Sequence, residues 1–317
     1  MPSPPPPIVI VGCTASGKSD LAEALAVRLG GVIMAVDSMQ VYRGMDIGTA
    51  KPDAATRARI PHLMIDVAEP WETYSAARFI SEARPYLENS EARIQNSELG
   101  ARPLILIGGT IFYLRALLEG MFEGPGADEA IRAALAAEAE KVGVPALHAR
   151  LAAVDALAAS RIHPNDLRRI VRALEVYQLT GKPISELQTQ WSREHPQIAA
   201  TMIGVQREKD LLNRRINARV KTMLELGLVE EVRRLWQDPR GFSEEAAAAV
   251  GYRQIVDHFQ GKCSLEDAVE EIKIQTRHLA KMQRTWLKRF RNITWLEPKE
   301  DQPSSVLIDQ ALAAISK

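Results

Sequence analysis

The sequence predicts an α/β protein in which a core with a parallel sheet is interrupted by an all-helical insertion. Two observations predict this fold class. Over about the first hundred residues, short apolar runs alternate with helical patterns, which is typical of parallel strands joined by crossover helices. From about Glu123 the composition changes to Ala, Leu, Glu and Arg with few β-branched residues, which favours helices.

The first strands are predicted at three apolar runs, Ile8–Val11, Val32–Val36 and Leu104–Ile107. Each run ends at a loop rich in Gly, Ser, Asp or Thr. In open α/β sheets, ligands bind beyond the carboxyl ends of the strands, so we expect a site at these loops.

The insertion is predicted to open at Gly124-Pro125-Gly126 and to close near His195-Pro196, because Gly and Pro break regular structure. The chain therefore divides into a first core segment (1–122), the insertion (123–196) and a second core segment (197–317). The elements predicted in the second core segment are a strand within Ala199–Val205, a helical region over Asp210–Trp236, a long helix over Leu265–Arg291, a strand at Ile293–Leu296 and a helix over Val306–Ile315.

Composition and charge exclude several classes of protein. The 317 residues include 40 Lys and Arg against 40 Asp and Glu, so the net charge indicates no class of partner. Cys13 and Cys263 lie far apart in the sequence, which predicts neither a disulfide framework nor a zinc site. The N-terminus lacks signal-peptide features, and no apolar run approaches the length of a bilayer span. We expect a cytoplasmic monomer with no membrane partner.

Residues 12–19 read GCTASGKS and match the phosphate-binding P-loop pattern GxxxxGK[ST]. The loop follows a predicted buried strand and precedes a predicted helix over Asp20–Leu29, which is the context that this motif requires. A glycine-rich turn without a ligand is disfavoured because Lys18 and Ser19 are both in register. Lys18 is expected to reach the terminal phosphates and the Ser19 hydroxyl to bind Mg²⁺. The residues expected to bind the phosphates are Gly12, Cys13, Thr14, Ala15, Ser16, Gly17, Lys18 and Ser19.

The P-loop alone does not identify the phosphate that it holds. Nucleoside triphosphatases, kinases and transferases that release diphosphate could all use it, so the core is described as similar to P-loop NTPases. Phosphoryl-transfer enzymes of this type usually have a second strand that ends in an Asp for the metal. Here the strand Leu104–Ile107 is followed by Gly108-Gly109-Thr110, which supplies no carboxylate. Asp37, or Asp66 after the apolar run 63–65, could replace it.

Beyond the P-loop, several separate motifs follow one another in a fixed order. In this order the chain resembles the bacterial tRNA dimethylallyltransferase family over nearly its whole length. The motifs that carry the resemblance are DSMQVY at 37–42, GTAKP at 48–52, HLMIDV at 62–67, GGTIFYLRALLEG at 108–120, RALEVY at 172–177, AVGYRQ at 249–254, TRHLAK at 276–281 and TW at 285–286.

The resemblance implies that the P-loop holds the diphosphate of dimethylallyl diphosphate, the leaving group, with Mg²⁺. The acceptor would be N6 of adenosine 37 in tRNAs that read codons starting with U. Asp37 would be the general base, and capping of a short helix at Ser38 is its alternative role. Thr110 and Gln40 would contact a flipped adenosine, and catalysis would rest on Asp37, Lys18 and Thr110. Arg207 would add a diphosphate contact, or else be an exposed arginine at a helix start.

A basic stripe is predicted on the last long helix. Between Ile272 and Leu296 there is no acidic residue, and six cations fall on one face about 80° wide, which favours a phosphate-backbone site over a solvated face. These cations are Lys273, Arg277, Lys281, Arg284, Lys288 and Arg291. The first five of these cations are expected to contact tRNA because of this charge pattern. By resemblance, the other expected tRNA contacts are Asp37, Ser38, Met39, Gln40, Thr110, Arg132, Arg168, Arg169, Ile170, Val171 and Arg172. An ion pair between Arg172 and Glu175 is the alternative for the insertion.

Two other functions stay open at this point. One is a relative that prenylates free adenine nucleotides, which would need no row of cations. The other is a P-loop kinase, or a nucleotide-dependent RNA-binding protein without this activity. The chain also departs from the family pattern, with Cys13 in place of the usual Pro, Met282 in place of a basic residue and Arg168 in place of Gln.

Overall fold

The computed structural model describes residues 6–88, 102–122, 124–188, 197–300 and 302–316. The chain forms two compact units, one made of the segments up to Leu118 and from Ile198 onward, and one made of Glu119–Gln197. The predicted insertion boundaries at Glu123 and at His195-Pro196 lie outside the described residues. Among the described residues, no helix is both long enough and apolar enough to cross a membrane.

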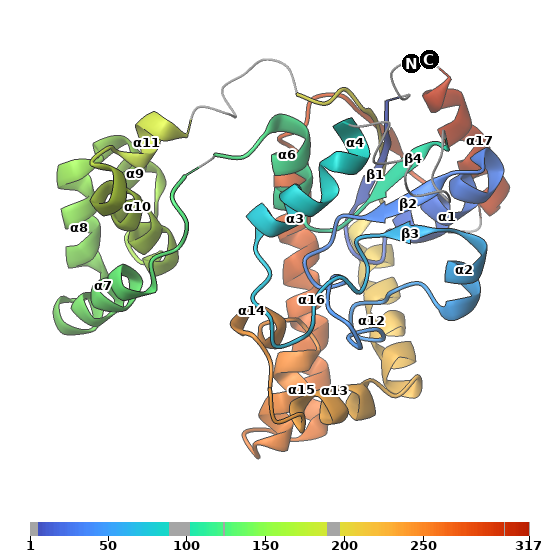
Figure 1. The fold of residues 1–317 in the computed structure, drawn as a ribbon. Helices are drawn as coiled ribbons and strands as arrows, with labels where there is room; N and C mark the ends of the chain where they lie inside the picture. The colour runs from blue at the N-terminus through green and yellow to red at the C-terminus, as the bar shows by residue number, and fades with distance from the viewer. Residues whose placement is uncertain (1–5, 89–101, 123, 189–196, 301, 317) are drawn as a thin grey trace. The chain divides into compact units, whose positions relative to one another are not determined.

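The first unit is built on a six-stranded parallel sheet with the strand order β3-β2-β4-β1-β5-β6 (Figure 1). This confirms the predicted fold class. The strands are β1 Ile8–Gly12, β2 Val32–Ala35, β3 His62–Leu63, β4 Leu104–Ile107, β5 Thr201–Val205 and β6 Ile293–Leu296. Since β4 lies between β2 and β1 and all three strands are parallel, the loops that follow β1, β2 and β4 emerge together at one edge of the sheet.

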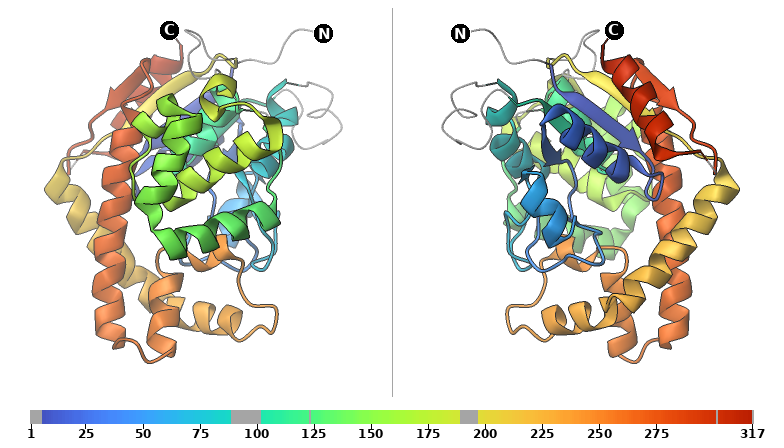
Figure 2. Two further views of the ribbon diagram at one scale, coloured as in Figure 1. Left: turned by 90° about the vertical axis from the view of Figure 1, so that its left-hand side faces the viewer. Right: turned by 90° about the vertical axis from the view of Figure 1, so that its right-hand side faces the viewer.

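Two helices cover one face of this sheet. Helix α1 (Lys18–Leu29) and helix α17 (Ser304–Ile315) pack against each other, as the right-hand view of Figure 2 shows. Their apolar residues join the sheet in a buried cluster with Ile10, Ile105 and Ile203. This burial explains why the strands consist almost entirely of apolar residues, since the strands of a parallel sheet are usually covered on both faces.

Further helices build the rest of this unit. The predicted helical region 210–236 is two helices, α12 (Lys209–Glu225) and α13 (Leu228–Trp236), because Gly227 adopts a left-handed φ of 97° between them. Helix α16 ends at Leu287, so the predicted extension to Arg291 is wrong. The remaining helices are α2 Ala54–Arg59, α3 Ala76–Ala83, α4 Pro85–Glu88, α6 Ile111–Glu119, α14 Glu244–Ala247, α15 Tyr252–Phe259 and α16 Leu265–Leu287.

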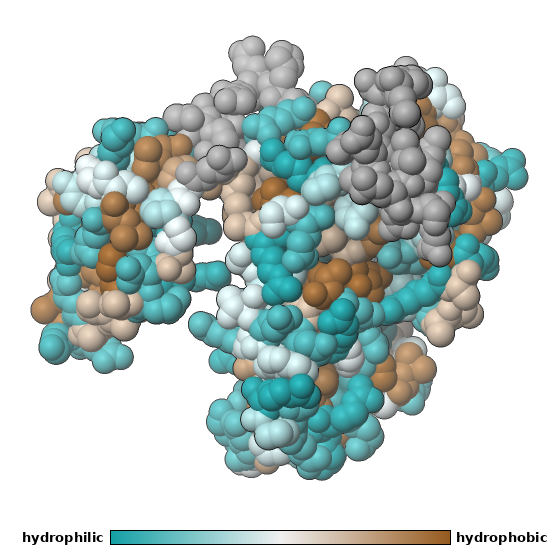
Figure 3. All heavy atoms as spheres, in the orientation of Figure 1, coloured by the Kyte–Doolittle hydropathy of each residue, from teal (hydrophilic) through white to brown (hydrophobic). Residues whose placement is uncertain are grey.

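Helix α16 packs along α12 and against α15, and one part of it approaches β1. The end of the unit formed by α13 and α15 is mainly hydrophilic on the face that Figure 3 shows. The sheet edge that carries the P-loop is therefore flanked by α12 and α16, which supply side chains to the site described below.

The second unit is all helical. Its helices are α7 Glu129–Val142, α8 Val144–Val154, α9 Ala156–Arg161, α10 Leu167–Thr180 and α11 Ile184–Leu187. They enclose a separate apolar core that includes Leu135, Leu147 and Leu174. Aspartates cap three of the helices at their N-termini, where a side-chain oxygen satisfies a backbone N–H that has no partner within the helix.

Candidate active site

The P-loop connects β1 to α1 with the geometry that its sequence predicts. Gly12 ends β1, and a Cβ at this position would lie 2.6 Å from Ser16 Oγ and 2.7 Å from the Val205 carbonyl oxygen, so no larger residue fits. Ala15 and Gly17 have left-handed φ angles of 61° and 96°. Alternation of this kind turns successive N–H groups toward one side of a loop and makes a concave site for anions.

Lys18 begins helix α1, and its ammonium lies 3.4 Å from the Cys13 carbonyl oxygen, to which it donates. Burial, and to a lesser extent the nearby Arg219 guanidinium, lower the pKa of Lys18 to about 8 against the opposing effect of Asp37. A desolvated cation at the N-terminus of a helix is a strong attractor for a phosphate group, which would restore the charge balance.

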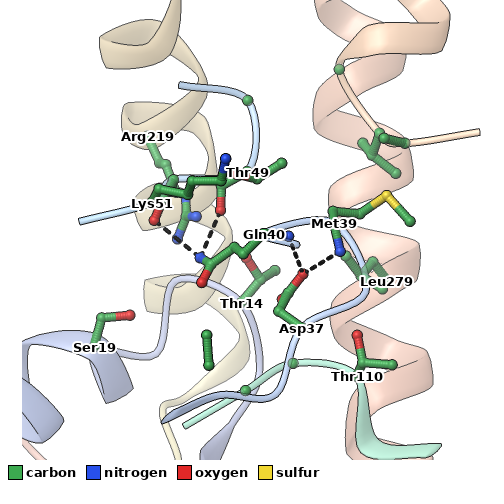
Figure 4. A pocket seen from close by; sticks show the side chains of 18 of the residues that line it. Thr14, Ser19, Asp37, Met39, Gln40, Thr49, Lys51, Thr110, Arg219 and Leu279 are labelled. Carbon is green, nitrogen blue, oxygen red and sulfur yellow. Dashed lines mark hydrogen bonds between the residues drawn. The ribbon is translucent and has the colours of Figure 1, made fainter. Parts of the chain in front are cut away.

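A cavity of about 600 Å³ lies at this edge of the sheet. This volume is within the usual range for small-molecule sites, which is about 300–1,000 Å³. Figure 4 shows that side chains from the P-loop, from the loops after β2 and β4, and from helices α12 and α16 converge on it. The loop 248–251, between α14 and α15, also lines the cavity, a contribution that we had not predicted from the AVGYRQ motif.

Asp37 and Thr110 meet in this cavity. Asp37 Oδ1 accepts hydrogen bonds from the N–H groups of Met39 (2.9 Å) and Gln40 (3.3 Å), so the carboxylate caps the turn that follows it. Thr110 Oγ1 accepts from the Ser38 N–H at 2.9 Å and donates to Ser38 Oγ at 3.2 Å. The capping alternative is therefore present, and it fixes the orientation of the Asp37 carboxylate. Among the described residues, Oδ2 of Asp37 has no hydrogen-bond partner.

Gln40 is held by the loop 46–50. Its amide nitrogen donates to the carbonyl oxygens of Thr49 (3.1 Å) and Ala50 (3.3 Å), as the dashed lines in Figure 4 mark. The buried Glu231 of α13 holds this loop in turn, because its carboxylate accepts three backbone N–H groups and the Tyr252 hydroxyl. The GTAKP and GYRQ motifs, about two hundred residues apart, thus meet in one structural network.

Arg219 of α12 is a site residue that sequence reasoning missed. It lines the cavity, and the described part of the chain provides no hydrogen-bond partner for its guanidinium. Burial lowers the pKa of Arg219, although Asp37 and Asp20 oppose this effect. The available signal was its position among the apolar residues Ile216 and Val220, because a cation on the buried stripe of an amphipathic helix needs an anion to face.

The structure corrects the expectation for Arg207. Its guanidinium donates to the carbonyl oxygens of Ser16 (2.7 Å) and Pro298 (3.2 Å), and the residue is not among those that line the cavity. Arg207 therefore holds the P-loop from outside the cavity, and Arg219 is an arginine that lines the cavity. Asp66 is also excluded as a metal ligand, since Lys51 and Arg57 both pair with its carboxylate.

Oxygen donors suitable for Mg²⁺ do line the cavity. They are the hydroxyl of Ser19 and the carboxylates of Asp20, Glu23 and Asp37. Mg²⁺ at phosphate sites is usually bound by one or two protein groups together with waters and substrate phosphates. The residues present therefore fit the ion.

The basic stripe of α16 is reduced by local pairing. Lys273 pairs with Glu270, and Arg277 donates to Asn217 Oδ1 at 2.6 Å. Lys281 and Arg284 are exposed, and Lys288 is the exposed C-cap residue of the helix. Arg291 lies beyond the helix end, so the six predicted cations do not form one continuous helical face.

In the insertion, the ion-pair alternative is present. Glu175, fully buried, accepts hydrogen bonds from Arg132 (2.8 Å) and Arg172 (2.6 Å). The side chains of Ile170 and Val171 belong to the apolar core of this unit and are 0% and 9% exposed, so the expectation that they contact RNA is wrong for their side chains. Of the predicted contacts at 168–172, Arg168 and Arg169 are exposed, and Arg169 pairs with Asp166 at 3.4 Å.

The family model of the IPP transferases matches residues 40–290. The chain is 44% identical over 290 residues to the tRNA dimethylallyltransferase of Geobacter metallireducens, with 92% of each chain covered. It is 45% identical over 305 residues to that of Xylella fastidiosa, with 94% of each chain covered.

Solved structures agree with this comparison. The full-length tRNA isopentenylpyrophosphate transferase of Bacillus halodurans has a TM-score of 0.67 and 36% identity, and the match covers 98% of this chain and 96% of that one. A eukaryotic dimethylallyltransferase, captured in crystals acting on tRNA, has a TM-score of 0.78 and 27% identity over 98% of this chain and 79% of that one.

The parallel sheet, the P-loop and the cavity at the carboxyl ends of the strands define a P-loop α/β enzyme. The family match and the relatives above make the assignment specific. The chain belongs to the IPP transferase family, whose members named above are tRNA prenyltransferases.

Proposed function

We propose that this chain transfers a dimethylallyl group from dimethylallyl diphosphate to N6 of adenosine 37 in tRNAs that read codons starting with U, and releases diphosphate. The observation that carries the proposal is the shared cavity, in which the P-loop with Lys18 and Arg219 faces Asp37 and Thr110. A cationic end and a carboxylate end within one cavity match a reaction that expels an anion and removes a proton.

The P-loop end would hold the leaving group. Lys18, Arg219 and the N–H groups of the loop would bind the diphosphate, and they would stabilise the negative charge that grows on it as the C1–O bond breaks. Preorganisation of these groups favours the reaction, because dipoles and charges that are already in place need no reorganisation as the bond breaks. When bound, Mg²⁺ would neutralise part of the diphosphate charge, with the Ser19 hydroxyl as a ligand.

The Asp37 end would accept the adenosine. The lone pair of N6 forms the bond to C1 of the prenyl group, the C1–O electron pair leaves with the diphosphate, and a proton from N6 passes to Asp37. Hydrogen bonds from Met39 and Gln40 fix one carboxylate oxygen, so the other is presented in a defined direction. Thr110 would position the base, and the amide nitrogen of Gln40 is already used by the loop 46–50.

The tRNA would bind through its phosphates. Lys281, Arg284 and Lys288 on α16 and Arg168 and Arg169 in the insertion are exposed cations suited to a polyanionic backbone. A free adenine nucleotide would need no such set of cations. The adenosine would have to leave its stack in the anticodon loop to enter the cavity.

The function can be tested with the purified chain, dimethylallyl diphosphate, Mg²⁺ and an unmodified tRNA that carries A-A-A at positions 36 to 38. We expect the RNA to gain the mass of one dimethylallyl group at adenosine 37, and we expect no gain when that position is guanosine. A gain on AMP but not on tRNA would instead indicate a free-nucleotide prenyltransferase. ATP turnover without any gain on RNA would overturn the proposal.

Asp37→Asn separates the role of base from the role of cap. The amide oxygen of Asn can still accept the two backbone N–H groups, whereas the side chain can no longer accept a proton. We expect kcat to fall by about 10²–10⁴-fold, the usual contribution of a general base, with tRNA affinity unchanged. If Asp37→Asn keeps normal turnover and only Asp37→Ala loses it, the carboxylate acts solely as a cap.

A further inference from the structure

One buried side chain on α16 connects the two ends of the cavity. Gln283 is 6% exposed and lies on the helix that also carries Lys281 and Arg284. Its neighbours in the sequence face solvent, whereas Gln283 points inward and lines the cavity. A buried amide needs partners for both its oxygen and its nitrogen, so its contacts indicate what it does.

The two halves of the amide bind two different loops. Gln283 Oε1 accepts a hydrogen bond from the Thr14 N–H at 2.8 Å, within the P-loop. Gln283 Nε2 donates to the Gly109 carbonyl oxygen at 2.9 Å, directly before Thr110. These loops follow β1 and β4, and the amide joins them rigidly because it is planar.

The contact with Gln283 requires a residue without a side chain at position 109, and this residue is Gly109. A Cβ at position 109 would lie 2.6 Å from Gln283 Nε2, so any other residue would push the amide away. The same Cβ position is 3.6 Å from Asp37 Oδ2. The contact therefore lies beside the carboxylate proposed as the base.

The helix itself is attached to the P-loop at a second point. The Cys13 thiol donates to the Ala280 carbonyl oxygen at 3.3 Å, one turn before Gln283 on α16. Helix α16 thus holds the P-loop at both Cys13 and Thr14.

We propose that Gln283 is a positioning residue that sets the distance between the P-loop, where the diphosphate would bind, and the end of the cavity that carries Asp37 and Thr110. This inference rests on the proposed function. The carbon that is attacked is held through the diphosphate, and the attacking nitrogen is held at Asp37 and Thr110. A change in the spacing of the two loops therefore changes the approach of the two reacting atoms. A misplacement of about 1 Å can cost on the order of 10²-fold in rate.

The first test compares Gln283→Met with wild type. Met fills a similar volume but can make neither hydrogen bond, so we expect kcat to fall about 10- to 100-fold, with the KM for tRNA within twofold. Gln283→Glu places a carboxylate oxygen against the Gly109 carbonyl oxygen and beside the anion-binding loop, so its kcat should fall at least as far as that of Gln283→Met. Gln275→Met is the matched control, because Gln275 lies on the same helix and bonds only to Glu271 at the surface. Its kcat should match that of wild type.

A second test changes Gly109, the residue on the other side of the contact, both alone and together with Gln283. Gly109→Ala should lower kcat by a factor similar to that of Gln283→Ala, since it displaces the same amide. In the double variant the two losses should not multiply, because the clash at position 109 disappears when Gln283 is shortened. If Gln283→Met folds poorly, Gly109→Ala still tests the same contact, because it displaces the amide without changing Gln283.

Three results would overturn the inference while the proposed function stands. They are an unchanged kcat in Gln283→Met, a loss confined to the KM for tRNA, and fully multiplicative losses in the cycle. The second result would make Gln283 an RNA contact, and the third would make it a general packing residue. Wild-type transfer is measured first, and its absence would overturn the proposed function itself.

Discussion

The cavity of the first unit and the helical insertion both place cations near carboxylates, but their cations have different partners. In the insertion, Arg132 and Arg172 donate to the buried carboxylate of Glu175, which also accepts the Asp128 N–H. In the cavity, Arg219 has no hydrogen-bond partner among the described residues.

The electrostatics follow the same division. Burial alone would raise the pKa of Glu175, yet the hydrogen bonds from Arg132 and Arg172 lower it, so the group is ionised and balanced. Burial lowers the pKa of both Lys18 and Arg219, which signals cations without full compensation. The arginines of the insertion are therefore neutralised by a carboxylate of the protein and belong to its folded structure. Lys18 and Arg219 lack such a partner, which indicates that they are arranged to bind an anionic ligand.

Removal of the Arg219 charge should produce the largest effect. In Arg219→Gln the cavity keeps its shape but loses one cation that faces the diphosphate. We expect kcat to fall by about 10²–10³-fold, the usual cost of one donor to a developing anion, with tRNA binding unchanged. Steady-state transfer assays measure this change. Arg214→Gln is the control, because Arg214 lies on the same helix and pairs at the surface with Glu300.

If Arg219→Gln keeps the wild-type kcat, Arg219 does not stabilise the leaving diphosphate. Its role would then be structural, like that of Arg132 and Arg172 in the insertion.

The second prediction concerns the pH dependence of donor capture. Because the pKa of Lys18 is about 8, the side chain is cationic below that pH and neutral above it. We therefore expect kcat/KM for dimethylallyl diphosphate to fall as the pH rises through 8, by up to about tenfold per pH unit. The dependence of kcat at saturating donor should be flatter, since the bound anion raises the pKa of Lys18.

Lys18→Arg provides the check, because arginine stays protonated across this range. Its residual donor capture should show no decline above pH 8. A decline of the same size in this variant would assign the titration to another group.

The third prediction tests the insertion. Glu175→Gln removes the charge that balances Arg132 and Arg172, so we expect this unit to unfold more easily. The loss should stay below the about 3–5 kcal/mol typical when a fully buried pair is broken, because both arginines are partly exposed. Thermal unfolding of the whole chain measures it. Transfer to a free tRNA anticodon stem-loop at low temperature should change only slightly.

Glu138→Gln is the control for this variant, since Glu138 pairs with Arg150 at the surface of the same unit. If Glu175→Gln abolishes turnover while stability is unchanged, the Glu175 cluster is part of the functional site.

The smallest effect is expected for the exposed cations of α16. In Lys281→Ala combined with Arg284→Ala, tRNA binding should weaken and its dependence on salt should flatten. Each lost phosphate contact should reduce the slope of log K against log salt by about 0.7–0.9. Titrations at several salt concentrations measure the slope. Lys221→Ala is the control, because Lys221 is exposed on α12 and pairs with Glu225. An unchanged slope would show that these cations form an ordinary solvated face.

Much of the fold could be predicted from local patterns. The strands at Ile8, Val32 and Leu104 are continuous apolar runs, and the order of Gly12, Gly17 and Lys18 fixes the turn between β1 and α1. The break of the helical region at Gly227 was missed, because a single glycine within a periodic pattern is often tolerated. The end of α16 at Leu287 was also missed, because the basic pattern continues past the point where the helix stops.

The site was less accessible to sequence reasoning. Asp37, Gln40 and Thr110 were predicted from motifs and do line the cavity. For Arg219 the one local signal was its position among the apolar residues Ile216 and Val220, and Gln283 and Glu231 carry no recognisable local pattern. The loops that Gln283 and Glu231 bind lie 174 to 269 residues away along the chain. Arg207 was expected to contact the diphosphate, but spacing along the chain does not reveal which side of a loop a guanidinium occupies.

The sequence by itself determined the type of sheet, the phosphate-binding loop and the family, because each is encoded in contiguous residues whose backbone geometry is local. Only the tertiary structure decided which cations face the cavity and which are balanced by Glu175 or bonded to the P-loop. The reason is physical. The state of a charge depends on desolvation and on the groups that surround it in space, and distant segments of the chain supply those groups.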